Sequence, residues 1–392
     1  MSVRLPSLAH AAAFIACLLI PAGIVGAQDD VLRSAQHSYR VVPVVNGLVN
    51  PWSMAFLPRG EMLVTERAGR LRIVRGGVLL PAPVAGLPPI RAGNQGGLLD
   101  VVVHPGFAQN RLIYLTYSKP SPDSSRGTTA VIRGRFVRDS LLDIEEILVA
   151  EVWSAGQGHY GSRMAFDRDG FLFVTIGDRQ VPPSGDLEAH PAQLLATHHG
   201  KVLRIHDDGR VPQDNPFVGR EGALPQIWSY GHRNQQGLMV HPETNDVWAV
   251  EHGPQGGDEL NLIQRGRNYG WPVIGYGVNY RSGTAIHAGT MRQGMEQPVK
   301  VWVPSIATSG LLYYTGDKFP GWRGSVFVGG MVGQVLSRLT LDGQRAVSEE
   351  LLVQRRGRIR DVRQGPDGFI YLALDDNTGA PSGIVRLEPV VR

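Results

Sequence analysis

Short runs of alternating apolar and polar residues recur along this chain, and such alternation is typical of half-buried β-strands. One unit returns throughout: an apolar run, a turn containing Pro, Asp or Gly, a second apolar run and a polar end. Each copy predicts a β-hairpin, because β-branched and aromatic residues flank a loop that tolerates tight dihedral angles. Copies start at Ser53, Leu99, Arg163, Gly237 and Arg360, and a degenerate sixth starts at Gly324.

Each copy is followed by a further strand signal, such as 70–74 or 201–205, so the repeat holds about four strands. Repeats of this length favour a propeller, since a β-helix needs shorter repeats and a sandwich would not repeat one hairpin so often. We therefore predict an all-β fold: a six-bladed β-propeller of four-stranded antiparallel blades. A short opening strand at 39–45 precedes the first copy, and one short helical turn is expected at 189–197.

The polar ends of the repeated strands predict where a site would lie. Equivalent strand ends of a propeller share one face, around the central channel. We expect this of Glu66–Arg67, Gly177–Asp178, Glu251–His252 and Asp375–Asp376. Ordinary polar termination of a strand is the alternative for any one pair. The densest cluster of Gly, Asn and charge, 226–280, predicts loops held by a rigid scaffold.

The N-terminus predicts export. Arg4, the apolar run 11–24 and the small residues Val25–Gly26–Ala27 form a signal peptide over 1–27, followed by a propeller domain over 28–392. The run is short for a membrane span, so we expect a periplasmic or secreted protein without stable membrane insertion after cleavage. An uncleaved anchor is the alternative.

Composition narrows the chemistry. The single cysteine, Cys17, lies in the predicted signal peptide, which excludes disulfides and thiolate metal sites from the mature chain. The net charge of +4 comes mostly from dispersed arginines, and without a basic run no nucleic-acid partner is expected. Arginine-rich clefts also suit carboxylated or phosphorylated ligands, because the guanidinium fork matches these groups.

Several residues are candidates for chemistry. His159, in the Gly-flanked segment AGQGHYGSRMAF, is suited to take a proton near neutral pH, although a surface histidine is the alternative. Arg233–Asn234 places a fork donor beside an amide. Arg358 and Arg360 alternate and therefore share one strand face, where an anion between them would relieve their repulsion. Pairing with Asp361 or exposure to solvent are the alternatives.

Cation sites are predicted in the segment EHGPQGGDE. The carbonyls of Gly253 and Pro254 suit a hard cation, since calcium accepts backbone oxygens. Asp258–Glu259 with the carbonyls near Tyr269 would hold a second cation, unless these residues form an ordinary acidic turn. The sequence contains no EF-hand, P-loop, dinucleotide fingerprint or Ser nucleophile elbow.

Four long motifs carry a family resemblance: GNQGGLLDVVVHPGF, GHRNQQGL, EHGPQGGDELNLIQRGRNYGWP and GRIRDVRQGPDG. In this order they resemble the soluble quinoprotein sugar dehydrogenases, the glucose/sorbosone dehydrogenase group, and here its aldose sugar dehydrogenase branch. The resemblance runs from Asn50 to the final strand. It implies a six-bladed propeller that carries pyrroloquinoline quinone (PQQ) and calcium and oxidises aldoses at the anomeric carbon to lactones.

The resemblance also implies residue roles. His159 would take the proton of the anomeric hydroxyl while a hydride passes to the quinone, and Asp178 would orient this base. Gln95 and Arg233 would approach the quinone carbonyls, with Arg233 stabilising an oxyanion. The polar edge and carboxylates of the cofactor would be held by Asn234, Arg358 and Arg360. Calcium would bind to the carbonyls of Gly253 and Pro254, with a structural calcium at Glu259 and Tyr269.

The chain departs from the glucose-oxidising branch at two positions. Val332 stands where that branch has a cofactor lysine, and Gly158 stands where it has a carboxylate before the catalytic histidine. These departures favour a broader aldose dehydrogenase, with substrate contacts from the rim loops 181–196 and 281–297. The expected partners are a sugar and an unidentified electron acceptor, and the expected state is a monomer or homodimer. A calcium-dependent lactonase-type hydrolase and a non-catalytic binding propeller are the alternatives, the latter argued mainly from Val332.

Overall fold

A computed structural model describes residues 30–390, and from Val31 onward they form one compact unit. The predicted signal peptide at 1–27 lies outside the described residues. No helix in residues 30–390 is both long and apolar enough to cross a membrane.

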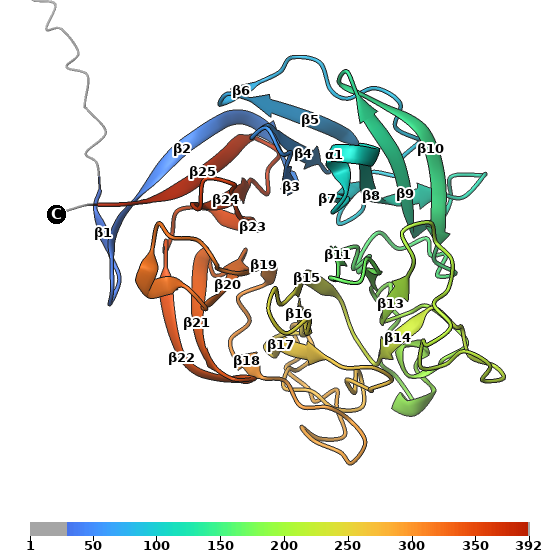
Figure 1. The fold of residues 1–392 in the computed structure, drawn as a ribbon. Helices are drawn as coiled ribbons and strands as arrows, with labels where there is room; N and C mark the ends of the chain where they lie inside the picture. The colour runs from blue at the N-terminus through green and yellow to red at the C-terminus, as the bar shows by residue number, and fades with distance from the viewer. Residues whose placement is uncertain (1–29, 391–392) are drawn as a thin grey trace, which may run out of the picture. The chain divides into compact units, whose positions relative to one another are not determined.

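Six antiparallel sheets are arranged in a ring, which confirms the predicted six-bladed β-propeller (Figure 1). Five blades have four consecutive strands each, and the innermost strand of every blade packs against the innermost strands of its neighbours. Blades one and two contain β3 (Pro51–Phe56), β4 (Met62–Glu66), β5 (Arg70–Arg75), β6 (Val78–Leu79), β7 (Leu98–Val103), β8 (Leu112–Pro120), β9 (Gly127–Val137) and β10 (Ser140–Val149). Blades three and four contain β11 (Met164–Phe166), β12 (Leu172–Ile176), β13 (Lys201–Ile205), β14 (Ile227–Tyr230), β15 (Gln235–Val240), β16 (Val247–Glu251), β17 (Asp258–Ile263) and β18 (Lys300–Trp302). Blade five contains β19 (Thr308–Tyr313), β20 (Val326–Gly330), β21 (Val335–Asp342) and β22 (Arg345–Leu352).

Blade six joins the two ends of the described chain. Its strand order is β1-β2-β25-β24-β23, from β1 (Leu32–Arg33), β2 (Ser38–Val49), β25 (Pro381–Pro389), β24 (Ile370–Asp375) and β23 (Arg358–Gln364). The sequence predicted only a short strand at 39–45, whereas β2 has 12 residues and pairs along β25. The register includes Tyr39 opposite Pro389 and Val45 opposite Ile384, so the opening strand closes the ring.

Two other expectations need correction. The copy starting at Gly324 covers the second and third strands of its blade, not the first and second, which explains why it matched the repeat poorly. The turn expected at 189–197 is a pair of 3-10 turns, η1 (Leu187–Ala189) and η2 (Pro191–Gln193). The sequence did not predict α1 (Phe107–Asn110) or η3 (Pro320–Trp322).

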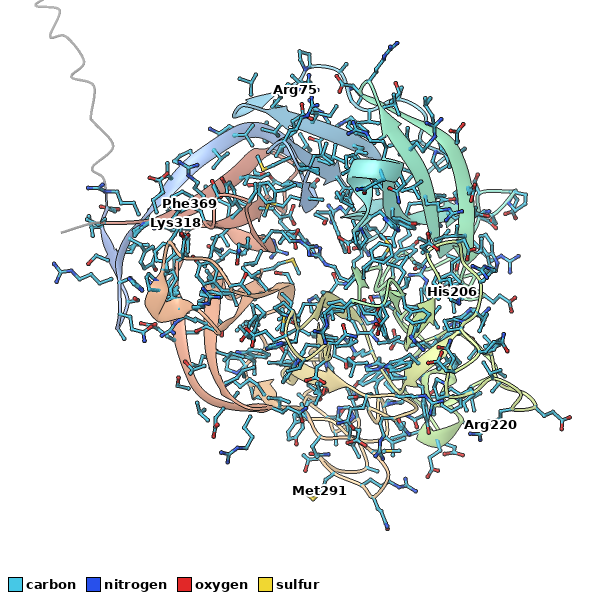
Figure 2. All side chains as sticks on the ribbon, viewed as in Figure 1. Arg75, His206, Arg220, Met291, Lys318 and Phe369 are labelled. Atoms are coloured by element: carbon cyan, nitrogen blue, oxygen red, sulfur yellow. The ribbon has the colours of Figure 1, made fainter. Side chains whose placement is uncertain are left out.

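The hydrophobic core lies between blades. The middle strands β4, β12, β13 and β16 are buried along their whole length, because each is covered by a neighbouring blade on both faces. Side chains fill the spaces between neighbouring ribbons, whereas Met291, with 73% of its surface exposed, lies at the outer edge (Figure 2).

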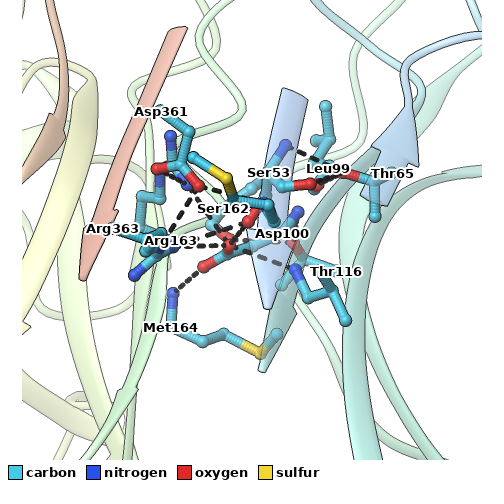
Figure 3. Close-up of polar contacts among 12 residues, drawn as sticks. Ser53, Thr65, Leu99, Asp100, Thr116, Ser162, Arg163, Met164, Asp361 and Arg363 are labelled. Atoms are coloured by element: carbon cyan, nitrogen blue, oxygen red, sulfur yellow. Dashed lines mark hydrogen bonds and ion pairs between the residues drawn. The ribbon is translucent and has the colours of Figure 1, made fainter. Parts of the chain in front are cut away.

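A buried ion cluster crosses the channel (Figure 3). The guanidinium of Arg163, only 1% exposed, lies 3.3 Å from Asp100 Oδ1 and 3.0 Å from Asp361 Oδ1. Arg363 also contacts both carboxylates, at 3.3 and 3.0 Å. The four residues come from the innermost strands of blades two, three and six and their ends. Each charge is therefore paired within the protein, as burial requires.

The two aspartates also join blades. Met164 N–H donates to Asp100 Oδ2 (2.7 Å), and Met54 N–H donates to Asp361 Oδ2 (3.0 Å). Asp100 in LDVVV and Asp361 in RDVRQ occupy the same position in their copies, and each binds the first strand of the next blade. A carboxylate in the innermost strand thus sets the position of the neighbouring blade.

We predict that Arg163→Met lowers the free energy of unfolding by about 3–5 kcal/mol, because it removes one of the two cations that compensate the buried carboxylates of Asp100 and Asp361. Denaturant unfolding of the purified protein measures the change. Arg168→Met, at an exposed position of the same blade, should change stability by less than about 0.5 kcal/mol. Equal stability of the two variants would contradict the assigned role of the cluster.

Candidate active site

Strand ends of several blades meet at one end of the channel. Arg67 and His252 follow the second strands of blades one and four, and both line a cavity of about 250 Å³. Trp52, Leu99 and Arg360, from three innermost strands, line it as well. The expectation that equivalent strand ends share one rim is confirmed here for Arg67 and His252. Glu66 instead has no exposed surface and accepts hydrogen bonds from Val49 N–H and Arg70.

His159 and Asp178 form a buried pair beside this cavity. His159 Nδ1 lies 2.6 Å from Asp178 Oδ1, and His159 N–H donates to Gln95 Oε1 at 2.8 Å. Gln95 lines the cavity, so this bond connects the histidine loop to it. An ionised carboxylate only accepts hydrogen bonds, so Nδ1 carries the proton and Nε2 keeps a lone pair.

The pKa values of His159 and Asp178 are both lowered, which favours a neutral imidazole beside an ionised carboxylate. Burial lowers the pKa of His159 below its ordinary value; the charge of Asp178 opposes this effect, and Arg233 adds to it. Burial alone would raise the pKa of Asp178, but attraction and hydrogen bonding from His159, with Arg233 and the Gln180 N–H, lower it below its ordinary value. A neutral imidazole beside a carboxylate is the arrangement of a general base.

Glu251 organises the loop before β15 that carries Arg233. Its carboxylate accepts a hydrogen bond from Arg233 N–H (2.7 Å) and contacts His232 Nδ1 (3.0 Å). Gly231 has φ +75°, and a Cβ there would lie 2.1 Å from Asn268 Oδ1, so the turn requires glycine. The Arg233 guanidinium then donates to Gly253 O (2.6 Å).

The cavity of about 250 Å³ is electropositive. Three guanidinium groups, of Arg67, Arg358 and Arg360, line it, and its lining contains no carboxylate. Oδ2 of Asp375 lies 3.9 Å from Arg358 Nε and 3.9 Å from Arg360 Nη2. Asp361 pairs with Arg163 and Arg363, so the alternative that it neutralises Arg358 and Arg360 is wrong. Burial, opposed by Asp375 and reinforced by Arg163, Arg67 and Arg358, lowers the pKa of Arg360 to about 10, which leaves it charged at neutral pH.

Buried donors at and beside the cavity have no hydrogen-bond partner within residues 30–390. They are Nε of Arg233, Nδ2 of Asn234 and Nε of Arg358, all in residues that the sequence singled out. Asn234 Oδ1 is already used, since it accepts from Gly161 N–H and Gln236 Nε2 (3.1 Å each). Unpaired buried donors are rare and expensive, so this group of donors fits an acceptor-rich ligand.

A second, smaller cavity of about 20 Å³ is lined by all four predicted metal ligands: Gly253, Pro254, Glu259 and Tyr269. Arg233, Glu251 and His252 also line it, and His252 belongs to the lining of both cavities. Its volume is of the order of one water molecule or one cation. The sequence predicted two cation positions, whereas here the ligands surround one small space.

The charge around the small cavity suits a cation. Burial, together with the neighbouring charges of Glu251 and Asp258, raises the pKa of Glu259 to about 8, although the hydrogen bond from Asn261 opposes this rise. Asn261 Nδ2 bridges Glu251 and Glu259, at 3.1 Å from each. Among residues 30–390, no group of three or more His, Cys, Asp and Glu side chains forms a metal site, so backbone carbonyls would have to complete the ligand set.

The two departures noted in the sequence both lie at the site. Val332 lines the larger cavity and is 67% exposed, so the positive charge of the cavity comes from arginines alone. A Cβ at Gly158 would lie 2.2 Å from the Gln180 carboxamide. Gln180 therefore fills the space that a side chain at position 158 would need.

The two predicted rim loops lie together. Arg292 and Glu188 form an ion pair at 2.7 Å, which joins 281–297 to 181–196. Trp271 also contacts both loops, with ring centroids 6.3 Å from His190 and 5.6 Å from His287. Sequence reasoning did not single out Trp271, although it lies in the noted motif RGRNYGWP. It also missed Trp52, an apolar residue at the start of a strand without any chemical signal.

Known proteins resemble this chain in both sequence and fold. The glucose / sorbosone dehydrogenase family model matches residues 48–386. The aldose sugar dehydrogenase YliI of Escherichia coli is 40% identical over 356 residues, covering 90% of this chain and 94% of that protein. The crystal structure of the soluble Escherichia coli aldose sugar dehydrogenase, in its apo form, superposes with a TM-score of 0.83 at 38% identity, covering 90% and 100% of the two chains. The PQQ-bound aldose sugar dehydrogenase of Streptomyces coelicolor gives a TM-score of 0.73 at 27% identity, covering 92% and 100%.

We predict that Asp178→Asn lowers the pKa of the His159 imidazole, because the carboxylate charge is the main group that raises it. Titration of the histidine ring nitrogens by NMR, with the His159 signal assigned from a His159→Asn variant, measures the change. Asp143→Asn, at an exposed ion pair with Arg135 in blade two, should leave this signal unchanged. A pKa equal to or above that of the unsubstituted protein would refute the pairing.

Proposed function

Because this chain belongs to the glucose/sorbosone dehydrogenase family, we propose that it oxidises aldose sugars at the anomeric carbon with bound PQQ and calcium. It is a sugar dehydrogenase of the PQQ-dependent type. The observation that best supports the cofactor site is a 250 Å³ cavity with three arginines, no carboxylate and unpaired donors nearby. Multiply charged carboxylate ligands are the class that such a pocket prefers.

The residues fit the cofactor as follows. Arg358 and Arg360 would hold its carboxylates, and Asn234 would donate to its polar edge through the unpaired Nδ2. Gln95 and Arg233 would lie near the reactive carbonyls, since Gln95 binds the His159 backbone and the Arg233 backbone carbonyl accepts from Asp178 N–H (2.8 Å). When bound, PQQ supplies the two-electron acceptor that the protein itself lacks.

The small cavity would hold calcium. Gly253 and Pro254 would contribute carbonyl oxygens, Glu259 a carboxylate, and Tyr269 its backbone oxygen. Calcium would polarise the nearby cofactor and neutralise the paired carboxylates. Arg233 donates to Gly253 O, so cation binding requires that this carbonyl be shared or released.

His159 would be the proton acceptor. Its Nε2 lone pair would take the proton of the anomeric hydroxyl, while the anomeric hydrogen would leave with both electrons of its C–H bond, as a hydride, for the two-electron acceptor that PQQ would supply. The sugar thus loses one proton and one hydride and becomes a lactone. The imidazolium formed would be stabilised by Asp178 at 2.6 Å. Because burial lowers the pKa of His159, the imidazole is neutral, and therefore competent as a base, at neutral pH.

The cellular setting is part of the proposal. The expected signal peptide places the enzyme in the periplasm or outside the cell, where a separate electron acceptor would reoxidise the cofactor. Position 158 is a glycine, and Gln180 fills the space that a carboxylate side chain there would need. We therefore expect activity on a broad range of aldoses, not strict specificity for glucose.

Reconstitution tests the function directly. Purified protein is mixed with PQQ and calcium, and dye reduction is followed with a panel of aldoses. We predict that His159→Asn lowers kcat by about 10²–10⁴-fold, the usual contribution of a general base. His159 has φ +48°, which asparagine tolerates well, so the fold should be retained.

PQQ binding by His159→Asn, measured by titration, should match the unsubstituted protein and so separates catalysis from cofactor loss. Sugar oxidation at an unchanged rate in His159→Asn would refute the base. Absence of PQQ-dependent turnover with every sugar in the unsubstituted protein would refute the proposed function.

We predict that Glu259→Gln removes most of the thermal stabilisation given by calcium, because the site loses its charged ligand. Binding at one hundred times Kd stabilises a folded protein by about 2.7 kcal/mol. Without calcium the variant should unfold at nearly the same temperature, since glutamine resembles the protonated carboxyl that burial favours. Glu243→Gln, at an exposed position, is the matched control. A full calcium shift in Glu259→Gln would exclude this residue as a ligand.

A further inference from the structure

Trp271 contacts two residues of the proposed active site, Asp178 and Arg233. Its indole Nε1–H donates to Asp178 Oδ2 at 2.8 Å, on the oxygen that does not face His159. The guanidinium carbon of Arg233 lies 5.1 Å from the centroid of the indole ring. The tryptophan is 7% exposed, so both contacts are shielded from water.

The backbone of Trp271 is fixed at both ends. Its N–H donates to Gly231 O (2.8 Å), two residues before Arg233, and its carbonyl accepts from Gln193 Nε2 (2.7 Å) in the first rim loop. Gln193 in turn exchanges hydrogen bonds with Asn268. The indole therefore has little freedom to move away from Asp178.

Among the described residues, three hydrogen bonds orient the Asp178 carboxylate. Oδ1 faces His159 Nδ1 and the Gln180 N–H (2.8 Å), and Oδ2 has the Trp271 indole. Gln180 and His159 both hold the same oxygen. Without the indole, Oδ2 would lose its donor and the carboxylate could turn about its Cβ–Cγ bond.

We propose that Trp271 is a positioning residue for the His159–Asp178 pair, through its indole N–H. The inference rests on the proposed dehydrogenase function, which gives His159 its role. In this arrangement the indole fixes the carboxylate plane, so that Oδ1 stays aligned with the imidazole, and it spreads the negative charge of Asp178 over both oxygens. Because His190 and His287 contact the same ring, the two rim loops help to position His159 through Trp271.

The test uses two replacements at position 271. Trp271→Phe removes the N–H and part of the ring. Site-specific incorporation of benzothienylalanine, which has the shape of tryptophan with sulfur in place of N–H, removes only the donor. Trp228→Phe is a closely matched control, because its ring also carries an arginine (Arg204, 5.0 Å) but its Nε1 has no partner in the protein.

We expect both replacements at 271 to lower kcat about tenfold or more, with KM and PQQ affinity changed less than about twofold, because one hydrogen bond to a charged group is lost. The acid limb of the kcat/KM profile should move to higher pH, since a more localised carboxylate charge holds a proton on His159 more strongly. The other charged groups that act on His159 are Arg179, from the same turn as Asp178, and Arg233. The sulfur analogue keeps the ring beside Arg233 and therefore isolates the effect of the N–H.

A loss of activity in Trp271→Phe that the sulfur analogue does not share would overturn the proposal, because shape and not the N–H would then matter. An unshifted acid limb in both variants, or an equal loss in Trp228→Phe, would overturn it as well. If the unsubstituted protein shows no sugar oxidation, the proposed function fails. The positioning role of Trp271 is then tested separately, by NMR of the cofactor-free protein. There the His159 ring-nitrogen signal must change in the sulfur analogue, and an unchanged signal refutes the positioning role.

Discussion

The arrangement of the blades depends on one buried cation. Arg163 pairs with Asp100 of blade two and Asp361 of blade six, donates to Gln236 O of blade four (2.7 Å), and lies over the Trp52 ring of blade one (4.1 Å). A charge with partners on four other blades has a single satisfactory position, because any displacement would weaken its pairing with two buried carboxylates. The innermost strands are therefore placed relative to one another by electrostatics as well as by packing.

The same cluster separates the two ends of the channel. Along β3, Trp52 lines the 250 Å³ cavity, whereas Met54, Ala55 and Phe56 line a cavity of about 480 Å³ at the other end. Along β23, Arg358 and Arg360 belong to the first cavity and Arg363 to the second. The positive charge that suits an anionic cofactor is thus confined to one face, and the paired ions of the cluster do not compete for it.

The sequence predicted the hairpins that recur in every blade, but not the contacts that join one blade to another. Hairpin copies and their polar ends were sufficient to predict six blades and to place Arg67 and His252 at one rim. The pairing of β2 with β25 was not predictable, because alternation identifies a strand but not a partner from the other end of the chain. Arg163 read as an ordinary polar residue at the start of a copy, since nothing local shows that its partners are carboxylates of two other blades. Trp271 was missed for a similar reason: a tryptophan in a motif gives no sign of which oxygen its N–H will meet.

Ring closure has a consequence for how the protein is made. The strand β2, from the start of the described chain, can pair with β25 only after β25, the last of the described strands, has been synthesised. Until then blade six lacks its outer half and β2 presents unsatisfied backbone groups along twelve residues. Contacts between distant parts of a chain form slowly, because the intervening chain must first lose conformational freedom. A nascent chain released early would therefore keep five blades and an open seam, and the step that completes the molecule is the pairing of β2, near the start of the described chain, with β25 at its end.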